Sequence, residues 1–109
     1  MNFTNESFDD IVVVTPRIKE ITSDNSLEFR DKLSGILKEN TEVILDLCEI
    51  GFIDSSGLGA LINCYKNLDR RKDIILCGMN QQVVSLFAIT HLDKIFNIYT
   101  NREEAIKSR

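Results

Sequence analysis

Two apolar runs of strand length, separated by a segment of helical periodicity, constrain the fold of this chain most strongly. The runs are Val43–Leu47 and Asp73–Cys77, and both are almost continuously apolar. Such strands are expected at the centre of a parallel sheet that helices cover on both faces. Between them, the apolar spacing predicts an amphipathic helix from Leu58 to about Asp69. A strand, a helix and a second strand in this order imply a parallel pair joined by a right-handed crossover.

The remaining segments continue this alternation. The β-branched run Ile11–Val14 predicts a strand that Pro16 ends, because proline has no N–H to donate to a ladder. Residues 1–8 are expected to form a short edge strand before it. The apolar spacing after Leu27 predicts a helix whose start Asp24, Asn25 or Ser26 would cap.

The last third of the chain predicts three short elements. Residues 82–87 have helical spacing, residues 95–99 alternate like an edge strand, and Asn101 with Glu104 three residues later opens a final helix. We therefore expect an α/β fold with one domain over residues 1–109. Its mostly parallel central sheet should have four to five strands, accompanied by about four helices.

Composition excludes several classes of function. A chain of 109 residues with 43% hydrophobic and 28% charged residues is typical of one globular domain. Its net charge of −4 argues against nucleic acid as a partner, since only Arg70–Lys72 forms a basic run. No apolar run approaches the roughly 20 residues needed to cross a bilayer, and acidic residues stand where a signal peptide would be basic. We expect a cytoplasmic protein without direct membrane insertion.

The cysteine pattern does not indicate a metal site. Cys48, Cys64 and Cys77 are odd in number and lack the C-x-x-C spacing of zinc sites and redox pairs. All three lie in apolar segments, so we expect three buried, reduced thiols and no bound metal or other cofactor.

The segment Asp54-Ser55-Ser56-Gly57 carries the chemistry that the sequence offers. It follows a buried strand and opens a helix, so it should lie at the carboxyl ends of the strands, where α/β proteins bind ligands and partners. A serine at a helix N-terminus has its hydroxyl near solvent and near unpaired backbone N–H groups. A phosphate on Ser55 would add about −1.5 to −2 charges that the positive end of the helix dipole tolerates.

The neighbours of Ser55 allow two interpretations each. Asp54 would repel a phosphoserine and sharpen the difference between two states, or it would only cap the helix. Gly57 and Gly59 each lower helix propensity by roughly 1 kcal/mol relative to alanine. They would admit close approach by a partner, or they would only let the helix pack closely on the sheet.

These residues and their surroundings resemble the sequence pattern of a known protein family. The strand Val43–Leu47, the string Phe52-Ile53-Asp54-Ser55-Ser56-Gly57-Leu58-Gly59 and the pair Tyr65-Lys66 are similar to the STAS-domain anti-sigma-factor antagonists. Residues further along the chain also match that family's third helix and the approach to its last strand. These residues are Gly78-Met79, Val83, Leu86-Phe87, Thr90-His91-Leu92 and Phe96. The resemblance covers roughly Ile11 to Ile106.

The resemblance implies a partner-switching cycle without enzymatic activity in this chain. In that family, the unphosphorylated antagonist binds an anti-sigma factor that is also a GHKL-type, ATP-dependent serine kinase. The kinase phosphorylates the serine after the motif aspartate, here Ser55, and so releases the antagonist. A metal-dependent serine phosphatase resets it. The family's Gly-Glu-Leu-Asp loop, which helps to dock the kinase, is replaced here by Lys19-Glu20-Ile21-Thr22, a departure that bears on partner identity rather than on fold.

The expected partner-binding surface and its rivals complete the sequence-based hypothesis. The residues expected to meet the partner are Glu20, Ile21, Thr22, Asp24, Asp54, Ser55, Ser56, Gly57 and Leu58. Catalysis is disfavoured because the single histidine, His91, is far from Ser55 in sequence and neither a Gly-x-Ser-x-Gly elbow nor a P-loop is present. The alternative is a STAS scaffold that does not switch, or a subunit of a stress-signalling or lipid or anion transport assembly.

Overall fold

The computed structural model describes residues 1–69 and 71–109. The elements follow one another as β1 (Phe3–Phe8), β2 (Ile11–Pro16), β3 (Glu20–Ile21), α1 (Ser26–Glu39), β4 (Glu42–Asp46), β5 (Phe52–Ile53), α2 (Ser55–Lys66), β6 (Asp73–Cys77), α3 (Gln81–Ile89), the 3₁₀ turn η1 (Leu92–Lys94), β7 (Asn97–Tyr99) and α4 (Arg102–Lys107). None of the helices in the described ranges has the length and apolar character that a membrane crossing requires.

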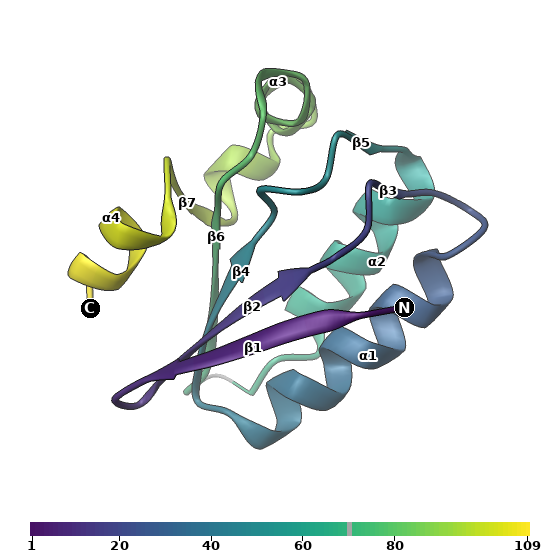
Figure 1. Ribbon diagram of the computed structural model, residues 1–109. Helices are drawn as coiled ribbons and strands as arrows, with labels where there is room; N and C mark the ends of the chain where they lie inside the picture. Colours follow the sequence, from purple (N-terminus) through teal and green to yellow (C-terminus); the bar gives the residue numbers. More distant parts are fainter. Residues whose placement is uncertain (70) are drawn as a thin grey trace.

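The central sheet has five strands in the order β1-β2-β4-β6-β7 (Figure 1). Strand β1 pairs antiparallel with β2, and the other neighbouring pairs are parallel. The registers place Ile44 beside both Val13 and Ile75 at the middle of the sheet. The expected α/β fold is confirmed, with an antiparallel edge formed by the N-terminal strand.

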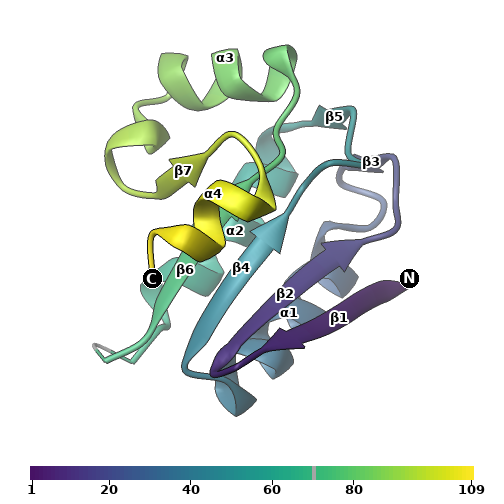
Figure 2. The ribbon, with the colours of Figure 1, turned by 60° about the vertical axis from the view of Figure 1, so that its left-hand side comes forward.

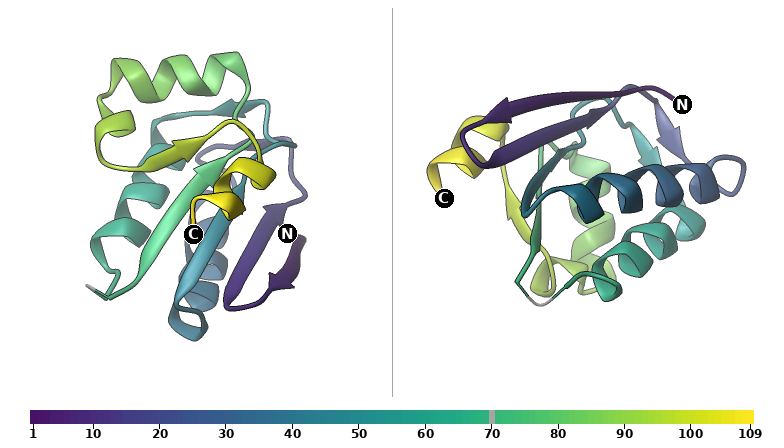
Figure 3. Two further views of the ribbon diagram at one scale, coloured as in Figure 1. Left: turned by 90° about the vertical axis from the view of Figure 1, so that its left-hand side faces the viewer. Right: turned by 90° about the horizontal axis from the view of Figure 1, so that it is seen from below.

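Helices cover both faces of this sheet, as the continuous apolar strands predicted. Figure 2 shows α4 in front of the sheet and α1 and α2 behind it, and Figure 3 shows α1 and α2 side by side. The larger core lies on the α1 and α2 side, where Phe29, Leu33 and Leu61 are fully buried. On the other face, Ile44 and Ala105 belong to a smaller cluster under α4. Helix α3 lies beyond the carboxyl ends of the strands (Figure 1).

A second, two-stranded sheet was not expected from the sequence. Strands β3 and β5 pair in parallel, with Glu20 beside Phe52 and Ile21 beside Ile53. The sequence patterns predict neither segment as a strand, because two residues are too few to show a period. This small sheet leads directly into α2 and therefore carries the start of the candidate site.

Two boundaries also differ from the expectation. Helix α2 ends at Lys66 instead of Asp69, because Leu68 N–H donates to Tyr65 O in a tighter turn that keeps Leu68 against the core. Strand β7 has only three residues, since Ile95 follows the 3₁₀ turn. Of the basic run, Arg70 lies outside the described residues, and Lys72 Nζ donates to the carbonyls of Leu37 and Lys38 at the end of α1.

Candidate functional site

Ser55 is the first residue of α2 and its side chain is exposed. No hydrogen bond within the described parts of the chain engages its hydroxyl. The next residue, Ser56, is half-buried. Of the two adjacent serines, Ser55 is therefore the more accessible to a modifying enzyme.

Asp54 caps α2 and ties it to a distant loop. Its Oδ1 accepts from Gly57 N–H at 3.0 Å, and its Oδ2 accepts from Ser23 N–H at 3.2 Å. Its own N–H donates to Ile21 O at 3.1 Å. The capping interpretation of Asp54 is therefore confirmed, and the carboxylate beside Ser55 is already engaged by two backbone donors.

Gly57 is required by packing. A Cβ on Gly57 would lie 2.7 Å from Ile53 Cγ2 and 2.8 Å from Ile21 O, which is too close for any side chain. Helix α2 can therefore approach the two-stranded sheet only with glycine here. Gly59, in contrast, is exposed and has nothing within 4 Å of the position of a Cβ.

The loop between β3 and α1 is braced by Asn25. Its side-chain oxygen accepts from Thr22 N–H at 2.9 Å and its Nδ2 donates to Glu20 O at 2.9 Å. Asn25 precedes α1 as expected, but its side chain does not cap the helix. Glu20 is exposed in β3 and Asp24 is exposed on this loop, which the Asp54 to Ser23 bond brings next to the start of α2.

The other predicted contact residues lie beneath the surface. Ile21 is fully buried, Leu58 is 7% exposed and Gly57 is buried, while Thr22 is half-buried. Buried side chains shape the backbone of the site and cannot present themselves to a partner. The exposed part of the predicted set is therefore Glu20, Asp24 and Ser55, with Thr22, Asp54 and Ser56 partly exposed.

Sequence interpretation missed Asn80, which caps α3. Its Oδ1 accepts from Val83 N–H at 2.8 Å and its Nδ2 donates to Gly51 O at 3.1 Å, next to β5. Its place before an apolar helix indicates the cap. The bond to Gly51, 29 residues earlier, has no local signal in the sequence.

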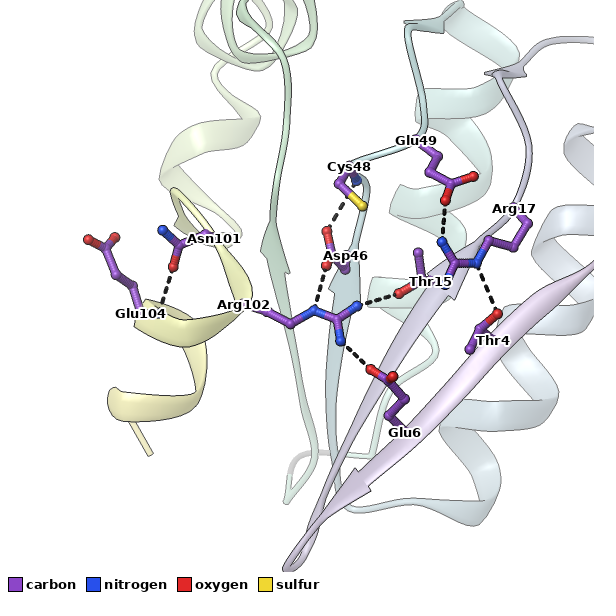
Figure 4. Close-up of polar contacts among 10 residues, drawn as sticks. All are labelled: Thr4, Glu6, Thr15, Arg17, Asp46, Cys48, Glu49, Asn101, Arg102 and Glu104. Carbon is purple, nitrogen blue, oxygen red and sulfur yellow. Dashed lines mark hydrogen bonds and ion pairs between the residues drawn. The ribbon is translucent and has the colours of Figure 1, made fainter.

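A second polar cluster surrounds Arg102 at the start of α4 (Figure 4). The guanidinium donates to Asp46 Oδ2 at 2.9 Å, to Thr15 Oγ1 at 2.9 Å and to Glu6. Partial burial lowers the pKa of Arg102, but its hydrogen bonds to Asp46 and Glu6 outweigh that effect and raise it. The cluster fastens α4 to three strands of the sheet.

The thiols near this cluster correct one expectation. Cys64 and Cys77 are buried as expected, but Cys48 is exposed in the loop after β4. Partial burial and the neighbouring Asp46 raise the pKa of Cys48. Burial raises the pKa of Cys64 to about 11 and that of Cys77 to about 12. All three thiols are therefore protonated at neutral pH and poor nucleophiles.

The fold and this site together define a small α/β domain that presents an accessible serine at the start of a helix. More particularly, the sequence model of the STAS domain matches residues 2–105, and the chain belongs to the STAS domain family. The resemblance that the Asp54–Gly59 segment indicated is thus confirmed.

The relatives of this chain include anti-sigma factor antagonists. A protein of Thermotoga maritima, provisionally named an anti-sigma factor antagonist, is 28% identical over 108 residues, which are 96% of this chain and 95% of that protein. Its crystal structure gives a TM-score of 0.87, covering 97% of this chain and 92% of that one. The anti-sigma-B factor antagonist of Listeria monocytogenes is 35% identical over 63 residues, 57% of this chain and 55% of the relative's length.

The same fold occurs in a protein solved in two states. The Bacillus cell fate determinant SpoIIAA is 21% identical to this chain in its unphosphorylated and phosphorylated forms, with TM-scores of 0.69 and 0.68. The likeness covers 98% of this chain and 96% of SpoIIAA in the first form, and 99% and 100% in the second. At this identity the likeness concerns the fold.

Proposed function

We propose that this protein is an anti-sigma-factor antagonist in a cytoplasmic partner-switching cycle, with Ser55 as its phosphorylation site. The unphosphorylated protein binds an anti-sigma factor that has GHKL-type serine kinase activity, and phosphorylation releases it. The protein acts as a binding module and a substrate, and it catalyses nothing itself. The single observation that carries this proposal is the exposed Ser55, at the first turn of α2, beside an engaged Asp54.

The phosphorylation step needs nothing from this chain except the hydroxyl. The γ-phosphoryl group of ATP passes to Ser55 Oγ, ADP leaves, and a base on the kinase accepts the hydroxyl proton. ATP and Mg²⁺ belong to the kinase. A metal-dependent serine phosphatase hydrolyses the phosphoserine and returns the protein to its binding form.

The charge around Ser55 supports release by the phosphate. A phosphoserine would add about −1.5 to −2 charges beside Asp54 and next to the β3–α1 loop with its exposed Asp24, which follows the exposed Glu20 of β3. Helix α2 tolerates this charge at its N-terminus. A kinase surface packed against unmodified Ser55 would have to accommodate a dianion among carboxylates, and that disfavours the complex.

Labelling and capture with matched variants test this proposal. Wild type, Ser55→Ala, Ser55→Asp and Ser56→Ala are immobilised and exposed to a native lysate of the source organism with ADP, and bound proteins are identified by mass spectrometry. We expect wild type, Ser55→Ala and Ser56→Ala to retain an ATPase of the serine-kinase type that Ser55→Asp does not retain. With labelled ATP and that kinase, wild type and Ser56→Ala should take up phosphate and Ser55→Ala should not.

Two results would overturn the proposal. Equal retention of the same partners by wild type and Ser55→Asp would indicate a scaffold that does not switch. Labelling of Ser55→Ala would place the phosphate on another residue.

A further inference from the structure

Asn80 links the start of α3 to the residue that precedes β5. As the cap of α3 it accepts from Val83 N–H, and through Nδ2 it donates to Gly51 O at the start of the β5 segment. A groove of about 280 Å³ lies between these two elements and is lined by Gly51, Phe52, Ile53, Gln82, Val83 and Leu86. The bond from Asn80 to Gly51 links the two walls of this groove.

On its other side, β5 lies against β3, and a backbone hydrogen bond flanks this pair at each end. Gly51 N–H donates to Lys19 O at 2.7 Å, and Asp54 N–H donates to Ile21 O at 3.1 Å. These bonds attach a strand of two residues to another strand of two residues, which is far below the length that is stable alone. Ser55 follows this strand directly, so its position depends on how firmly β5 is held.

We propose that Asn80 is a positioning residue for the phosphorylation site. Its hydrogen bond to Gly51 attaches β5 to α3, and β5 leads directly to Ser55. Helix α3 therefore helps to fix the position of Ser55. The proposed effect of Asn80 on phosphorylation rests on the function proposed above. The proposed effect of Asn80 on the position of β5 rests on the hydrogen bonds alone.

The two bonds of Asn80 can be separated by one substitution. An aspartate caps a helix as well as an asparagine does, so Asn80→Asp keeps the bond from Val83 N–H. It has no Nδ2 to donate, and it would turn a carboxylate oxygen toward the carbonyl of Gly51. Asn80→Ser also retains a capping oxygen, but its side chain is too short to reach Gly51.

Asn101 provides a matched control. It caps α4 through the same kind of hydrogen bond, since its Oδ1 accepts from Glu104 N–H at 2.9 Å (Figure 4). Within residues 1–69 and 71–109, its Nδ2 donates to no protein group. Asn101→Asp therefore makes the same chemical change in a helix cap without breaking a bond to another element.

Amide hydrogen exchange tests the positioning of β5. The probes are the amides of Gly51 and Asp54, which donate to β3 and its flank. We expect both to exchange about tenfold faster in Asn80→Asp, and also faster in Asn80→Ser, than in wild type and Asn101→Asp. Unchanged exchange in a folded Asn80→Asp or Asn80→Ser protein would overturn the proposal.

Phosphorylation kinetics test the consequence for Ser55. With the kinase that wild type retains, kcat/KM for Ser55 should fall about tenfold in Asn80→Asp and stay unchanged in Asn101→Asp, because small misplacements of a reacting group are costly. Faster exchange with unchanged kcat/KM would make Asn80 structural only. If no kinase is retained, the proposed function fails, while the exchange experiment still decides whether Asn80 holds β5.

Discussion

The carboxylate of Asp54 accepts a hydrogen bond from the backbone N–H of Ser23, 31 residues earlier in the chain. The same carboxylate caps α2 through Gly57 N–H. Ser55 is therefore flanked by a side chain that holds the start of α2 and the β3–α1 loop together. The exposed Asp24 directly follows Ser23 on that loop.

Replacing Asp54 should destabilise the protein by a measurable amount. Asp54→Ala removes both bonds and should lower the free energy of unfolding by about 1–2 kcal/mol, the usual cost of losing a helix cap. Asp54→Asn retains an oxygen for Gly57 N–H and should lose less than half of that. Urea unfolding followed by circular dichroism measures the free energy of unfolding of both variants. Equal losses in Asp54→Ala and Asp54→Asn would mean that the capping bond from Gly57 N–H contributes little.

Alanine at the two glycines of α2 should have effects of opposite sign. Gly57→Ala places a methyl group 2.7 Å from Ile53 Cγ2 and should cost about 1–3 kcal/mol through overpacking. Gly59→Ala meets nothing within 4 Å and should stabilise by about 0.5–1 kcal/mol, because alanine has the higher helix propensity. The same unfolding experiment compares them. Stabilisation by Gly57→Ala would contradict the close packing of α2 on β3 and β5.

The Arg102 cluster should contribute far more than an exposed ion pair. Arg102→Ala leaves Asp46, which is 4% exposed, without its charged partner and should cost about 3 kcal/mol. The control is Arg17→Ala, which removes the exposed pair with Glu49 and should cost at most about 1 kcal/mol (Figure 4). Thermal unfolding of both variants measures the loss of stability. Equal losses of unfolding free energy in Arg102→Ala and Arg17→Ala would refute this ranking.

The three cysteines should differ in their reaction with iodoacetamide. Only Cys48 is exposed, so it alone should be alkylated in the folded protein, and all three in denaturant. The raised pKa of Cys48 keeps its thiolate scarce, so its rate should be below that of a free cysteine at pH 7.5 and should still rise above pH 9. Mass spectrometry of digested protein gives the rates. Alkylation of Cys64 or Cys77 without denaturant would contradict their burial.

The main architecture could be predicted from the sequence because its strands are long enough to show their character. Strands β4 and β6 are continuous apolar runs, and the helical spacing around Leu61 identifies α2. The Asn101 to Glu104 capping pattern was also correct. Such patterns are local, and burial on both faces of the sheet enforces them.

The features that could not be predicted depend on residues far apart in the chain. Strands β3 and β5 exist because each pairs with the other, and neither has a period of its own. The bond from Asn80 to Gly51 and that from Ser23 to Asp54 likewise join residues about 30 positions apart. Cys48 lies in an apolar sequence, yet it is exposed because it lies in the loop after the carboxyl end of β4. Sequence patterns therefore identify Ser55, but they do not predict the strand pairing and the long-range hydrogen bonds that fix its position.

The partners of Arg102 emerge from the ribosome well before it does. Asp46 precedes Arg102 by 56 residues and Thr15 by 87. Until Arg102 has been synthesised, the Asp46 carboxylate lacks this charged partner, and α4 cannot yet cover its face of the sheet. Docking of α4 is then the step that covers this face, because Ala105 of α4 packs with Ile44 and Ile75.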